Sequence, residues 1–134
     1  MNNYHTCLVC MGSNVDGCFH LQKAREALSH LFSQAEFGEP IETKAEGVTA
    51  QPNYWNQAVR FHTDSKADRV IEILKDIEKE NNRTATDKIT GRVPLDLDLL
   101  SYDEDILKPS DMHKSFVIQA LSSLPVSKSQ KLQK

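Results

Sequence analysis

The stretch LDLDLL at residues 95–100 decides how this chain can fold, because leucine and aspartate alternate in it. An alternation with a period of two predicts a β-strand, here over Leu95–Tyr102, with a proline immediately before it. On such a strand the odd-numbered leucines face a core, and Asp96 and Asp98 point together from the opposite side. The sequence therefore predicts a strand that is buried on one face and carries two neighbouring carboxylates on the other.

Other segments with regular patterns lie before and after this strand. We expect strands at His5–Met11, Ile41–Lys44 and Tyr54–Thr63, and helices at Phe19–Phe32, from after Ser65 to about Asn82, and at Phe116–Leu124. The leading order of strand, helix, strand, strand, helix, strand is the ferredoxin-like βαββαβ order. It predicts an α+β fold in which helices cover one face of an antiparallel sheet and the other face is available for a ligand. We expect residues 1–125 to form a single domain and residues 126–134 a disordered tail.

The composition excludes several classes of protein. The chain has 134 residues and a formal charge of −3, whereas nucleic-acid-binding domains are usually basic. No segment approaches the roughly 20 apolar residues that span a bilayer, and the first residues do not resemble a signal peptide. Of the three cysteines, Cys7 and Cys10 lie on a predicted strand without a second ligand pair, so we expect core residues and no zinc site. These features indicate a cytoplasmic protein.

Asp96 and Asp98 are the strongest candidates for a functional site. Two ionised carboxylates this close together repel each other, and a divalent cation removes that repulsion. Mg²⁺ prefers oxygen ligands and is commonly held by one or two carboxylates together with substrate phosphates. The alternative is a solvated strand face decorated with aspartate, although aspartate is depleted in strands.

Further polar residues have two possible explanations each. Arg83 and Arg92 bracket the segment that leads to the aspartates, where guanidinium groups could contact a polyphosphate, but taken alone they also fit a solvated connection. Tyr54 and Asn56 share a strand face and could bind a flat heterocycle by stacking and amide hydrogen bonds, or could make a cross-strand contact. Glu78 could lie near a nucleotide or simply on the helix surface.

Taken in chain order, these motifs resemble those of the 6-hydroxymethyl-7,8-dihydropterin pyrophosphokinase family of folate biosynthesis. The resemblance covers roughly residues 5–124. The matching motifs are Gly12-Ser13-Asn14, Pro52-Asn53-Tyr54-Trp55-Asn56-Gln57-Ala58-Val59, Ile77-Glu78 with Arg83 after it, and Gly91-Arg92 leading to Leu95-Asp96-Leu97-Asp98.

The resemblance implies a pterin pyrophosphokinase that transfers the β,γ-diphosphate of ATP to the pterin hydroxymethyl oxygen and releases AMP. Asp96 and Asp98 would bind two Mg²⁺ ions. The residues implied in pterin binding are Thr43, Tyr54, Asn56 and Phe116. Those implied in ATP binding are Glu78, Arg83, Arg92 and His113, and the two arginines would also be catalytic. We expect a monomer that binds dihydropterin and ATP, and neither nucleic acid nor a membrane.

The sequence also departs from the family pattern, as in a divergent member. The tryptophan expected before the aspartates is absent, Arg92 lies one place early, and Ala85 replaces an expected basic residue. The segment His113-Lys114-Ser115-Phe116 is a shortened version of the family's. These departures leave open a catalytically impaired relative that acts as a pterin- or metal-binding module. An unrelated ferredoxin-like domain, such as a small-ligand sensor, is the third hypothesis.

Overall fold

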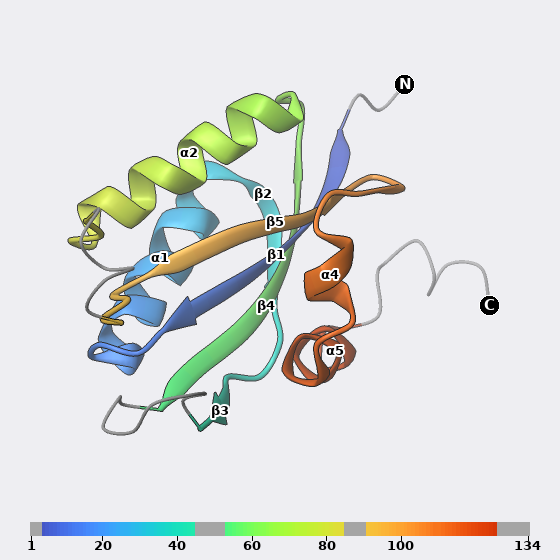
Figure 1. The fold of residues 1–134 in the computed structure, drawn as a ribbon. Helices are drawn as coiled ribbons and strands as arrows, with labels where there is room; N and C mark the ends of the chain where they lie inside the picture. Colours follow the sequence, from blue (N-terminus) through green and yellow to red (C-terminus); the bar gives the residue numbers. More distant parts are fainter. Residues whose placement is uncertain (1–3, 45–52, 85–90, 126–134) are drawn as a thin grey trace.

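A central antiparallel sheet organises the protein in the computed structural model, which describes residues 4–44, 53–84 and 91–125 (Figure 1). The six strands are β1 (His5–Ser13), β2 (Ser33–Phe37), β3 (Ile41–Thr43), β4 (Tyr54–Thr63), β5 (Asp96–Tyr102) and β6 (Asp105–Ile106). The sheet order is β2-β4-β1-β5-β6, and β3 pairs with β4 beside β2. All of these pairings are antiparallel. Strand β1 is therefore central, with β4 and β5 hydrogen-bonded on its two sides.

The two long helices cover one face of this sheet and enclose the main core (Figure 1). They are α1 (Gly17–Leu31) and α2 (Ala67–Glu80), and each buries an apolar stripe. The buried sheet residues opposite them include Val9, Phe61 and the three leucines at 95, 97 and 99. Burial of these side chains from water supplies the main stabilising force for the fold. The ferredoxin-like order and the inward-facing leucines predicted from sequence are confirmed.

Two short helices pack on part of the opposite face, α4 (Pro109–Met112) and α5 (Ser115–Ser122). A small second core of Cys10, Leu100 and Val117 joins them to the sheet. The face expected to be available for a ligand is thus partly covered. What remains open is a pocket between the sheet and these helices.

Several predicted boundaries differ from the observed ones. Strand β1 extends to Ser13, two residues beyond the predicted end at Met11. The edge strands β2 and β6 and the helix α4 were not predicted. The predicted tail over 126–134 lies outside the described residues.

The cysteines are free thiols, and their positions agree in part with expectation. Cys7 and Cys10 are buried, as predicted, and Cys18 is exposed. Within the described part of the chain no helix has the length and apolar character needed to cross a membrane. The cytoplasmic location stays a prediction.

Candidate functional site

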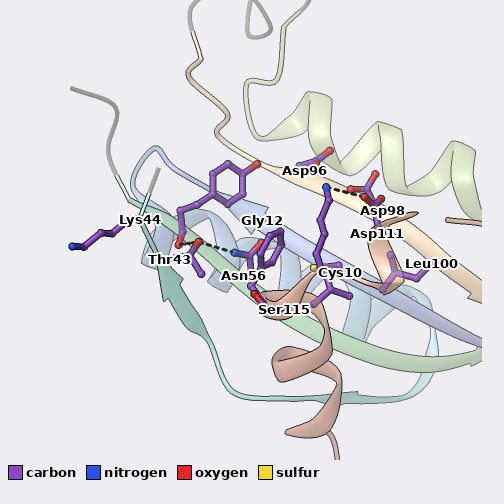
Figure 2. Close-up of a pocket in the computed structure, with 14 residues that line it drawn as sticks. Cys10, Gly12, Thr43, Lys44, Asn56, Asp96, Asp98, Leu100, Asp111 and Ser115 are labelled. Atoms are coloured by element: carbon purple, nitrogen blue, oxygen red, sulfur yellow. Dashed lines mark hydrogen bonds and ion pairs between the residues drawn. The ribbon is translucent and has the colours of Figure 1, made fainter. Parts of the chain in front are cut away.

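A pocket of about 430 Å³ opens on the face of the sheet opposite α1 and α2. Its walls come from β1, β3, β4, β5, α4 and α5, so residues far apart in the sequence meet there (Figure 2). Six of the predicted site residues line it: Thr43, Tyr54, Asn56, Asp96, Asp98 and Phe116. The two aspartates and the residues implied in pterin binding thus line one cavity.

Strand register explains why these side chains converge. In β1, Gly12 is paired with Asn56 of β4 on one side and with Asp96 of β5 on the other. Cys10 is paired in the same way with Ala58 and with Asp98. Residues directly opposite each other in an antiparallel sheet point to the same face. The pocket floor consequently consists of two cross-strand rows, each ending in an aspartate.

The half of the pocket near β3 and β4 combines an aromatic ring with a buried amide. Asn56 is 3% exposed, and its Nδ2 donates to Thr43 Oγ1 at 3.5 Å. The Thr43 hydroxyl in turn donates to the carbonyl oxygen of Tyr54 at 3.4 Å. Burial, with a further contribution from the nearby Asp96 charge, raises the pKa of Tyr54, so its ring stays neutral. This half can present a flat surface and a donor–acceptor edge to a heterocycle.

The other half is acidic. Burial raises the pKa of Asp98 to about 7, and the charge of Asp96 and a hydrogen bond with it act in the same direction. Burial also raises the pKa of the Cys10 thiol below them to about 12, so this cysteine is protonated and unreactive at neutral pH. Asp98 is therefore partly protonated at a pH where isolated aspartates are ionised.

This donor set fits Mg²⁺. Among the described residues no group of three or more His, Cys, Asp or Glu side chains could hold a metal ion together. Structural zinc requires four protein ligands, whereas Mg²⁺ usually takes one or two carboxylates and completes its coordination with water and substrate phosphates. Asp96 and Asp98 would supply those two carboxylates, and the proton on Asp98 is the one that a cation would displace.

Residues at and just after the end of α2 form hydrogen bonds with the backbone at the start of β5. Glu78 is 8% exposed, and its Oε2 accepts a hydrogen bond from the backbone N–H of Leu97 at 2.7 Å. Arg83 Nη1 donates to the carbonyl oxygen of Leu95 at 3.0 Å and to Asp96 Oδ1 at 3.3 Å. Burial raises the pKa of Glu78, and the Leu97 hydrogen bond acts against that rise. These contacts fix the backbone that carries the two aspartates.

Four predicted ATP-contacting residues do not line the pocket: Glu78, Arg83, Arg92 and His113. Arg92 and His113 are exposed. The Gly12-Ser13-Asn14 motif contacts the segment around Arg92 through its last residue. Asn14 Oδ1 accepts a hydrogen bond from the Val93 N–H at 2.6 Å, and Asn14 Nδ2 donates to the Gly91 carbonyl oxygen at 2.7 Å. The motif therefore ties the end of β1 to the entry of β5.

Sequence reasoning missed three charged residues of the pocket, Lys44, Asp111 and Lys114. Lys114 Nζ lies 2.9 Å from Asp111 Oδ1, and it also lies over the Phe116 ring at 5.9 Å from the ring centre. Asp111 belongs to α4, and Lys114 directly precedes α5. The spacing of three residues between this acid and this base, which suits neighbouring positions on one turn of helix, was the available signal.

Comparison with known proteins finds a family and several relatives. Residues 8–125 match the family model described as 7,8-dihydro-6-hydroxymethylpterin-pyrophosphokinase. A folate synthesis bifunctional protein of Arabidopsis thaliana is 34% identical over 99 residues, which are 71% of this chain and 20% of that protein. A 2-amino-4-hydroxy-6-hydroxymethyldihydropteridine pyrophosphokinase of Haemophilus influenzae is 29% identical over 130 residues, which are 87% of this chain and 79% of that protein. The chain thus spans about a fifth of the plant protein's length and most of the bacterial one's.

Proposed function

Because the chain belongs to the 7,8-dihydro-6-hydroxymethylpterin-pyrophosphokinase family, as its motifs predict, we propose that it transfers the β,γ-diphosphate of ATP to 6-hydroxymethyl-7,8-dihydropterin. The hydroxymethyl oxygen would bond to the β-phosphorus while the bond from that phosphorus to the α,β-bridging oxygen breaks, and AMP would leave. The observation that carries this proposal is the register of the pocket floor. It puts an amide suited to a heterocycle edge and a carboxylate suited to a cation on the two sides of one strand.

The pterin would lie in the half of the pocket formed by β3 and β4. Asn56 is buried and its amide is held by Thr43, so its remaining hydrogen-bonding capacity is fixed in direction. Tyr54 and Phe116 line the same cavity from β4 and α5, and their rings could enclose a flat heterocycle. A pre-positioned amide gives selectivity because a ligand that cannot match it leaves a buried polar group unpaired.

ATP would place its phosphates over the acidic half of the pocket. Asp96 and Asp98 would hold Mg²⁺, which when bound neutralises the triphosphate and polarises the phosphoryl group. We propose two ions, each completing its coordination with phosphate oxygens and water. Reactions of this class need positioning and charge neutralisation more than a covalent nucleophile, and the pocket offers the carboxylates and Lys114 for those purposes.

Three basic residues that do not line the pocket would contact the ATP phosphates from its surroundings. Arg83 and Arg92 flank the segment that enters β5, and we keep them, with His113, as proposed ATP contacts. Glu78 has a different proposed role. Because it is buried and accepts a hydrogen bond from the Leu97 backbone, it would position β5 behind the aspartates instead of contacting ATP. We also propose that the enzyme is a monomer.

The test is to incubate the purified protein with Mg²⁺, ATP and 6-hydroxymethyl-7,8-dihydropterin and to separate the products. We expect AMP and the pterin diphosphate in equal amounts, no ADP, and no product after chelation of Mg²⁺. AMP release that does not depend on the pterin, or ADP as the product, would contradict the proposal. Calorimetric pterin binding without any turnover would instead favour the catalytically impaired relative.

A further inference from the structure

Gly12 occupies a position where glycine has no local reason to be. It lies inside β1, is buried, and is paired on both sides. Among the described glycines the positive φ belongs to Gly91, so the backbone of Gly12 does not require the conformational freedom of glycine. Glycine also weakens a strand interior relative to residues with a side chain, and there it often marks a close approach. The reason must lie in the space that a side chain would fill.

That space is filled by the Tyr54 ring. A Cβ atom at Gly12 would lie 2.5 Å from Tyr54 Cε1, 3.3 Å from Tyr54 Cζ and 3.4 Å from Asn56 Oδ1. The first distance is far shorter than the 3.5–4.0 Å at which two carbon atoms attract each other. A methyl group at this position therefore cannot coexist with the ring where it now lies.

The ring would move before the strand does. The Gly12 backbone is held between β4 and β5, whereas Tyr54 is the first residue of β4 and is only half-buried. Displacing a central strand would break hydrogen bonds on both sides, and rotating one side chain breaks none of them. The observed orientation of the Tyr54 ring therefore requires a small residue at position 12, whereas the fold does not.

We propose that Gly12 is a positioning residue for the heterocyclic substrate: its missing side chain lets the Tyr54 ring lie against the sheet. This inference rests on the proposed function, because the Tyr54 ring is one of the two that would enclose the pterin. The row Asn56, Gly12, Asp96 spans two strand spacings, about 10 Å. Figure 2 shows Gly12 on the pocket floor among the pocket residues. The pterin hydroxymethyl group would have to cross this row to reach phosphates held above Asp96.

The test is Gly12→Ala, measured by calorimetric titration of 6-hydroxymethylpterin in the presence of Mg²⁺ and α,β-methylene-ATP. We expect the dissociation constant of the pterin to rise about tenfold, the order expected when one aromatic contact is lost. Gly17→Ala is the matched control. Its Cβ would also meet an aromatic side chain of β4, at 2.7 Å from Trp55 Cδ1, but neither residue lines the pocket, so pterin affinity should stay unchanged.

A double-substitution comparison separates positioning from general damage. In a Tyr54→Ala background the ring is gone, so adding Gly12→Ala should change pterin affinity by less than about twofold. An equal loss in both backgrounds, or no loss from Gly12→Ala alone, would overturn the inference. If Gly12→Ala does not fold, the double variant must fold, because it removes the clash, and its failure to fold would also overturn the inference.

A readout without ligand distinguishes this inference from the proposed function. In protein with ¹³C-labelled tyrosine, the Tyr54 ring resonance, assigned by Tyr54→Phe, should shift in Gly12→Ala and stay in place in Gly17→Ala. A native protein that binds no pterin would refute the proposed function. An unmoved Tyr54 resonance in Gly12→Ala would refute the role of Gly12 whatever the ligand is.

Discussion

The two faces of strand β5 differ in character, because one is apolar and packed in the core and the other is acidic and lines the pocket. On the face toward α1 and α2, Leu97 and Leu99 are 5% and 3% exposed and belong to the main core. On the other face, Asp96 and Asp98 converge so closely that burial and mutual repulsion raise the pKa of Asp98 to about 7. Alternate residues of one strand thus divide between the hydrophobic core and the proposed metal site. A change on one face should leave the property governed by the other nearly intact.

The largest expected effect is on activity and comes from the acidic face. Asp96→Ala should lower turnover by at least about 10³-fold, because it removes a proposed ligand of the ion that neutralises the transferring phosphates. The free energy of unfolding should change by less than about 1 kcal/mol, since the side chain is about a third exposed. AMP formation and urea denaturation measure the two quantities. Asp105→Ala, an exposed aspartate on the neighbouring β6, is the control and should change neither.

The next effect is on stability and comes from the leucine face. Leu99→Ala should lower the free energy of unfolding by about 3 kcal/mol, because it leaves a cavity between the sheet and the helices. Turnover per folded molecule should stay within about twofold of the native value. Leu107→Ala is the matched control, since Leu107 is 39% exposed, and it should cost less than about 1 kcal/mol. A large loss of turnover in folded Leu99→Ala would show that the two faces are coupled.

The same contrast explains what the sequence could predict. The core-facing alternation in β5 and the alternation in the long strand β4 are period-two patterns, and both strands were located to within a residue. Strand β2 was missed because Ser33–Phe37 is polar and forms an edge, with a register shift and a positive φ at Gln34 that hide the alternation. Residues without periodicity leave no such signal.

The candidate site followed the same rule. Asp96 and Asp98 lie on one regular strand and Tyr54 and Asn56 on another, so the shared face of each pair could be predicted from spacing. That the two pairs meet depends on the register of β1 between them.

Lys114 comes from the short segment before α5, and only the tertiary fold brings it to the pocket. Glu78 was placed near ATP by the family resemblance. Spacing could not reveal that its carboxylate accepts a hydrogen bond from the Leu97 N–H.

A smaller effect concerns pH and metal affinity on the acidic face. A cation must displace the proton on Asp98, whose pKa is raised to about 7. Below that pH the apparent affinity for a divalent cation should fall by up to about tenfold per pH unit, and above it the affinity should level off. Mn²⁺ titration followed by EPR, without nucleotide, measures this while avoiding protonation of the triphosphate. An affinity that is constant between pH 5.5 and 8 would contradict the raised pKa of Asp98.

The smallest effect is a gain in stability, and it gives the sharpest test of the two-face comparison. The pKa of Asp98 is raised from its ordinary value of 3.8 to about 7 in the folded state, so between these values the folded protein binds more protons than the unfolded one. Its stability without metal should therefore fall as pH rises from about 4 to 7. Asp98→Asn removes the group that causes this loss of stability. With solvent screening allowed for, it should raise the free energy of unfolding by about 1 kcal/mol at pH 8 and leave it unchanged at pH 4.

Urea denaturation at the two pH values, with and without Mg²⁺, measures this difference. Added Mg²⁺ should stabilise the native protein at pH 8 and have little effect on Asp98→Asn, because a ligand stabilises only the state that binds it. The matched substitution Asp105→Asn, at an exposed aspartate of β6, should give no gain at either pH. If Asp98→Asn were instead less stable at pH 8, Asp98 would be a structural residue like the leucines beside it. The acidic face would then contribute to stability, and the separation of roles along β5 would be wrong.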